Sequence, residues 1–137
     1  IEQNKNMKLT VPFYLNKAGA GFPSPATDYI EEDVDLNAHL IKNVPATFII
    51  RVQGKSMANV GIYDGDLLVV DKSLKPKNFS TVIANVHDEL VVKNFVKTKN
   101  EQFLASGSKK IEDKIIINNE SDIFIWGVVT YVIHSVY

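Results

Sequence analysis

Residues 81–96 read TVIANVHDELVVKNFV, and this stretch decides the fold class of the chain. Residues 81–86 and 90–96 are two apolar runs rich in valine and isoleucine, and the polar residues 87–89 separate them. β-Branched residues favour strands, and a short polar break between two such runs is typical of a tight turn. The stretch therefore predicts two neighbouring β-strands.

The same pattern continues on both sides of this stretch. Turn signals such as Tyr63-Asp64-Gly65-Asp66 separate further apolar runs. These runs lie at residues 47–53, 66–71, 102–105, 114–117 and 123–133. Short strands at such close spacing predict a mostly β fold, a compact, highly twisted antiparallel domain over residues 35–137.

The first 34 residues have a different composition. They contain several prolines and glycines, among them Pro23 and Pro25, and they have little periodic apolar pattern. Proline removes a backbone donor and disfavours helix at the residue before it, so residues 1–34 are predicted to form an extended N-terminal arm. Asp35 can cap one short helix that ends near Lys42.

Composition bounds the possible classes of protein. The chain has 137 residues, 45% of them hydrophobic, which is enough for one domain with a core. Its formal net charge is −1, so the overall charge gives no support for nucleic-acid binding. The absence of cysteine excludes a disulfide framework, a thiol nucleophile and a cysteine zinc site. No apolar run approaches the roughly 20 residues that span a bilayer, so no membrane partner is predicted.

Two residues in this framework are candidates for a catalytic role. Ser56 follows the strand predicted at 47–53, just after Gly54, where the backbone can turn. Lys93 lies inside the apolar run 90–96, and a lysine in apolar surroundings loses much of its preference for the charged form. Once neutral, it can accept a proton from a serine hydroxyl, so the pair is a candidate serine–lysine hydrolase site. Each residue also has an ordinary interpretation, as a turn serine and as a surface lysine whose stem covers apolar neighbours.

The other polar candidates are assigned structural roles. His39, His87 and His134 have no aspartate or serine partner at a recognisable spacing, and we interpret them as surface or structural residues. Asp64 and Asp66 flank a glycine, which is more typical of a turn than of a metal site. No metal or other cofactor is therefore predicted.

Three separated motifs occur in an order and at a spacing that resemble the LexA-type self-cleaving serine–lysine peptidases. They are Gly54-Lys55-Ser56-Met57, residues 61–71 and residues 89–93. The likeness extends upstream through residues 20–29 and downstream through residues 124–129. Within this family the chain is most similar to the UmuD-like SOS mutagenesis proteins, from about Pro12 to the C-terminus.

The resemblance implies that Ser56 is the nucleophile and Lys93 the general base of a serine endopeptidase. It also implies that the substrate is the Ala20-Gly21 peptide bond in the chain's own arm, so that cleavage is autocatalytic. The backbone N–H groups of Ser56 and Met57 are the expected oxyanion donors. Lys55 departs from the family pattern, which often has an acidic or neutral residue there, and we expect it to face solvent.

Partners follow from the same resemblance. It implies a cytoplasmic homodimer whose self-cleavage is stimulated by the RecA–single-stranded DNA filament. The processed form, from Gly21 onward, would join an error-prone Y-family DNA polymerase in translesion synthesis during the SOS response to DNA damage. Only twenty residues precede Gly21 and they have no helical repeat, so we expect neither a helix-turn-helix domain nor sequence-specific DNA binding.

Three other interpretations stay open. The chain could be the peptidase half of a phage or mobile-element LexA-like repressor. It could be a signal peptidase, which shares the serine–lysine chemistry but needs a membrane anchor. It could also be a polymerase accessory module without activity, although the presence of both Ser56 and Lys93 argues against a vestigial site.

Overall fold

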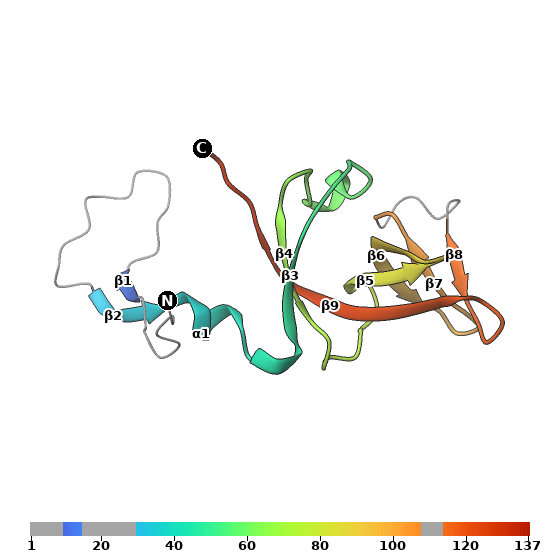
Figure 1. Ribbon diagram of the computed structural model, residues 1–137, viewed down its shortest axis with the longest axis horizontal. Coiled ribbons are helices and arrows are strands. Elements are labelled where there is room, and N and C mark those ends of the chain that lie inside the picture. The colour runs from blue at the N-terminus through green and yellow to red at the C-terminus, as the bar shows by residue number, and fades with distance from the viewer. Residues whose placement is uncertain (1–9, 15–29, 108–113) are drawn as a thin grey trace, which may run out of the picture. The chain divides into compact units, whose positions relative to one another are not determined.

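The computed structural model describes residues 10–14, 30–107 and 114–137 (Figure 1). The chain divides into two units, Ile1–Lys42 and Asn43–Tyr137. Every strand pairing in the described residues is antiparallel. The predicted boundary between arm and peptidase domain, after residue 34, stays a prediction.

The first unit contains a pair of strands and the helix. Strand β1 (Thr10–Tyr14) pairs with β2 (Ile30–Asp35), and α1 (Leu36–Leu40) follows directly. The Asp35 carboxylate accepts hydrogen bonds from the backbone N–H groups of Asn37 and Ala38, so the predicted capped helix is confirmed. The strand pair was not predicted, because residues 1–34 have little periodic apolar pattern, and β1 contains Pro12. In a pair of two strands each strand is an edge, where a residue without an N–H is tolerated.

The second unit is built on one seven-stranded sheet, and the predicted mostly β fold is confirmed. Its strands are β3 (Thr47–Arg51), β4 (Leu67–Asp71), β5 (Thr81–Val86), β6 (Glu89–Lys97), β7 (Gln102–Ala105), β8 (Ile115–Ile117) and β9 (Ile123–Ile133). Their order across the sheet is β3-β4-β9-β5-β6-β7-β8. All the strands predicted from residue 47 onward are present, with small differences at their ends. Two short 3₁₀ helices, η2 (Val44–Ala46) and η3 (Ala58–Val60), were not predicted.

Strand β9 connects the two halves of the sheet. Its first part pairs with β5 and its second part with β4, and a register shift interrupts each pairing (Figure 1). Gly127 lies where β9 changes partner, and a Cβ there would approach Val70 Cγ1 to 2.6 Å. The absence of a side chain therefore lets β9 pass close to β4.

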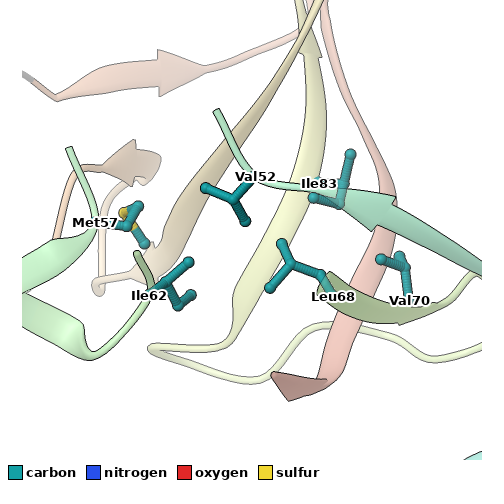
Figure 2. Packing of buried hydrophobic residues seen from close by; sticks show 6 residues of the cluster. All are labelled: Val52, Met57, Ile62, Leu68, Val70 and Ile83. Atoms are coloured by element: carbon teal, nitrogen blue, oxygen red, sulfur yellow. The ribbon is translucent and has the colours of Figure 1, made fainter. Parts of the chain in front are cut away.

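Buried side chains form two clusters. The first contains Val52, Met57, Ile62, Leu68, Val70 and Ile83, and Figure 2 shows these six side chains together. The second contains Val82, Ala84, Val86, Phe95, Leu104 and Val128. Successive residues of β5 belong to different clusters because side chains of a strand alternate between the two faces of a sheet. The first cluster matters for the site, since it anchors the loop that carries Ser56.

Candidate active site

A cavity of about 290 Å³ lies between three parts of the second unit. Its lining consists of residues 50–54 with Ser56 and Met57, of Ile83, and of residues 90–93. Ser56 and Lys93 are 37 residues apart in the sequence, and the fold brings both to this one cavity.

The Ser56 loop is fixed on the side that precedes the serine. Gly54 has a φ of 107°, a left-handed value that favours glycine, and its N–H donates to Asp64 Oδ1 at 2.7 Å. Val52 exchanges backbone hydrogen bonds with the facing turn, donating to the Asp66 carbonyl and accepting from the Gly65 N–H. The carboxylate of Asp64 therefore holds the turn that leads into Ser56.

The loop is also fixed on the side that follows the serine. Met57 is 2% exposed and packs in the first cluster, and its carbonyl accepts hydrogen bonds from the N–H groups of Val60 and Ile62. Ser56 itself is exposed, and so is Lys55, as expected. The nucleophile candidate thus stands at the surface on a turn that the core holds in place.

Lys93 is placed by the hairpin of β6 and β7. The last paired residues of this hairpin are Asn94 and Ala105, so Lys93 and Ser106 face each other one step further along. Lys93 Nζ donates a hydrogen bond to Ser106 Oγ at 2.6 Å, and Ser106 is 7% exposed. No hydrogen bond joins Ser56 and Lys93 in the described part of the chain. The structure therefore places both residues at one cavity without the direct contact that a dyad needs.

Sequence reasoning missed Ser106 and the partner of His134. His134 Nδ1 lies 2.6 Å from Asp66 Oδ1, and its ring contacts that of Tyr63. The sequence gives no hint of this pairing, because the two residues are 68 positions apart. Neither of them lines the cavity, so the pair is structural. In residues 10–14, 30–107 and 114–137, no three His, Cys, Asp or Glu side chains are grouped to hold a metal ion.

Asp66 makes the stability of the fold depend on pH. The backbone N–H of Tyr63 donates to Asp66 Oδ2 at 2.9 Å. This bond lowers the pKa of the Asp66 carboxyl below its ordinary value of 3.8, and the contact with His134 lowers it further. Burial of the carboxyl opposes this shift. A lowered pKa means that the unfolded chain takes up the proton first as the pH falls. The stability from Asp66 is therefore complete above its ordinary pKa and is lost as the pH falls through the lowered one.

We expect Asp66→Asn to reduce the free energy of unfolding at pH 6 and to reduce it less as the pH falls toward 3. The amide still accepts from Tyr63, but it carries no charge and does not titrate. Urea unfolding of the wild type and the variant between pH 6 and pH 3 measures this difference. Asp122→Asn, at an exposed aspartate, is the matched control, and it should leave the pH dependence as in the wild type. A wild-type pH dependence in Asp66→Asn would contradict the assignment.

The predicted cleavage bond, Ala20-Gly21, lies outside the described residues. No helix among the described residues is long and apolar enough to cross a membrane.

Comparisons with known proteins place the chain in a family. A family model described as Peptidase S24-like matches residues 12–130. Protein ImpA of Salmonella typhimurium is 42% identical over 123 residues, which cover 90% of this chain and 83% of ImpA. Protein MucA of Escherichia coli is 38% identical over 122 residues, covering 89% of this chain and 83% of MucA.

A repressor is also similar, over a smaller share. The LexA repressor of Shewanella denitrificans is 36% identical over 103 residues, which cover 75% of this chain and 49% of the repressor. The resemblance to LexA-type, UmuD-like proteins that the motifs predict is confirmed, and with it the class of serine peptidase. The chain belongs to the Peptidase S24-like family.

Proposed function

We propose that this chain is an SOS-response accessory protein for translesion synthesis that cuts its own arm between Ala20 and Gly21. The observation that carries the proposal is that Ser56 and Lys93 line one cavity in a member of the Peptidase S24-like family. The alternative, a peptidase half of a LexA-like repressor, has weaker support. ImpA and MucA match the chain at higher identity, and over most of their own length, whereas the match covers 49% of the LexA repressor.

The proposed reaction has four steps, each of which moves a proton and forms or breaks a bond. Neutral Lys93 accepts the proton of Ser56 Oγ while that oxygen attacks the Ala20 carbonyl carbon. The N–H groups of Ser56 and Met57 stabilise the oxyanion, and no other group accepts from them in the described residues. The lysine then returns the proton to the leaving amine of Gly21. Lys93 then accepts a proton from a water that attacks the acyl carbon. In the last step the bond to Ser56 Oγ breaks, and Lys93 gives this proton to the Ser56 oxygen.

The resting arrangement fits a slow, regulated reaction. Lys93 Nζ makes its hydrogen bond to Ser106 and none to Ser56 among the described residues, so Ser56 and Lys93 must approach each other for the first step. Catalytic hydrogen bonds often tighten only when the substrate is bound. We infer that entry of the arm, promoted by an activator, completes the dyad.

The edge of β6 offers a place for the arm. Residues 90–93 line the cavity and pair with β5 on one side, whereas β7 pairs only from Asn94 onward. An extended peptide can add to such an open edge through main-chain hydrogen bonds. Gly21 has no Cβ, which favours close approach of the scissile bond to Ser56.

The partners that we propose follow the family. They are a second copy of the chain, the RecA–single-stranded DNA filament as activator, and an error-prone Y-family DNA polymerase that binds the processed form in the cytoplasm. Exposed apolar side chains at the C-terminal end support a contact with another protein surface. They are Val132, Ile133, Val136 and Tyr137.

We expect purified protein to lose an N-terminal fragment slowly on its own and faster with activated RecA filament. The rate should rise with pH, because the base must be deprotonated. Intact mass and N-terminal sequencing of the product measure the site, and the new N-terminus should be Gly21. RecA without single-stranded DNA is the control for activation. A different N-terminus refutes the assigned bond, and a rate that falls through the alkaline range contradicts a lysine base.

A further inference from the structure

We propose that Ser106 is a positioning residue for the general base: its buried hydroxyl holds the Lys93 amine at the cavity. This inference rests on the proposed function, because it takes Lys93 as the base. The carrying observation is the hydrogen bond of 2.6 Å from Lys93 Nζ to Ser106 Oγ. Its charged partner and short length place it among the stronger side-chain hydrogen bonds.

The backbone that presents Ser106 is fixed from both sides. Leu104 and Ala105, just before it in β7, are 0% and 1% exposed. Gly107, just after it, is buried with a φ of 82°, and a Cβ there would lie 2.3 Å from Asn59 Nδ2. Because this turn has so little room to move, the Ser106 hydroxyl has a defined position.

The same turn contacts the segment that follows the nucleophile. Asn59 belongs to the 3₁₀ helix η3, three residues after Ser56, and its side chain packs against Gly107. Ser106 and Gly107 therefore connect the strand that carries Lys93 with the loop that carries Ser56. A group at this place can set the distance between base and nucleophile.

The chemistry of lysine explains why such a group is useful. A lysine side chain carries about 2 kcal/mol of rotamer entropy and extends readily into water. The ammonium form has three N–H donors, and the neutral amine keeps two donors and gains one lone pair. Ser106 Oγ can accept one N–H in either form, which leaves the lone pair of the neutral amine for the proton of Ser56. The hydroxyl thus restrains the base without occupying its basic site.

We expect Ser106→Ala to lower the maximal rate of self-cleavage by roughly 10- to 100-fold. Ser106→Thr keeps a hydroxyl and should recover much of the rate. Ser106→Cys keeps nearly the same side-chain volume but offers only a weak acceptor, so it should lose activity as Ser106→Ala does. It takes the place of Ser106→Ala in the test if the alanine variant folds poorly. Ser73→Ala is the matched control, since its hydroxyl binds Asp71 outside the cavity.

Self-cleavage of the full chain, followed by gel from pH 6 to pH 10 with activated RecA filament, measures these effects. A wild-type rate in Ser106→Ala overturns the inference, and so does a wild-type rate in Ser106→Cys, because that result indicates that the volume of the side chain matters and its hydrogen-bond acceptor does not. Both outcomes leave the proposed function intact if Ser56→Ala is inactive. Continued cleavage in Ser56→Ala overturns the proposed function and the role of Ser106 together.

Discussion

Ser56→Ala and Lys93→Ala are each expected to reduce self-cleavage by roughly 10³-fold or more. The first variant has no Oγ to attack the Ala20 carbonyl, and the second has no amine to accept the Ser56 proton. Because the two residues act as one unit, the double variant should lose no more activity than either single variant. Gel analysis of the intact chain and its product, with activated RecA filament, measures the loss.

The sequence offers a matched control beside the nucleophile. Lys55 is an exposed lysine next to Ser56, and Lys55→Ala removes one positive charge without touching the proposed dyad. Lys55→Ala should cleave itself at a rate within a few-fold of the wild-type rate. Lys93→Arg is the stricter test of the base, because arginine keeps the charge but does not lose its proton at these pH values, and we expect it to be inactive.

Two results would contradict the mechanism in different ways. Cleavage that continues in Ser56→Ala removes serine catalysis by this site. A wild-type chain that stays intact with activated RecA filament, although it is folded, favours the accessory module whose site is vestigial. Both outcomes are read on the same gel.

Strand positions could be predicted from the sequence because their signal is local. Residues 81–86, 102–105 and 123–133 are strands with the bounds that their apolar, β-branched runs indicate. The pairing of β1 with β2 could not be predicted, since residues 1–34 have little periodic apolar pattern and fifteen residues separate the two strands. Local pattern identifies a strand, whereas its partner depends on the chain as a whole.

The site shows the same division between local and distant signals. Ser56 and Lys93 stand in motifs that can be compared with a family, so the sequence alone is enough to nominate both. Ser106 follows a short strand and precedes a glycine, and this local sequence alone indicates only a turn. Its role depends on the register of β6 and β7, in which Lys97 pairs with Gln102 and Asn94 with Ala105. A prediction of that register would have placed Ser106 opposite Lys93.

Leu68→Ala is expected to lower the free energy of unfolding by about 2–5 kcal/mol. Leu68 is 0% exposed at the centre of the first cluster, and its loss leaves a cavity among well-packed neighbours (Figure 2). Leu74→Ala is the matched control, because Leu74 is 46% exposed, and it should change stability by at most about 0.5 kcal/mol. Urea unfolding at neutral pH measures both values, and equal losses would contradict the assignment of Leu68 to the core.

The same substitution should also slow self-cleavage under conditions in which the variant is still folded. Three members of the Leu68 cluster, Val52, Met57 and Ile83, line the cavity that holds Ser56 and Lys93. A core that relaxes around the missing side chain loosens those walls, and small displacements of reacting groups can cost large factors in rate. We expect a fall of roughly 10-fold in the rate, at a temperature where circular dichroism shows that Leu68→Ala is folded. A wild-type rate there would mean that the cavity walls are held by the loop hydrogen bonds alone.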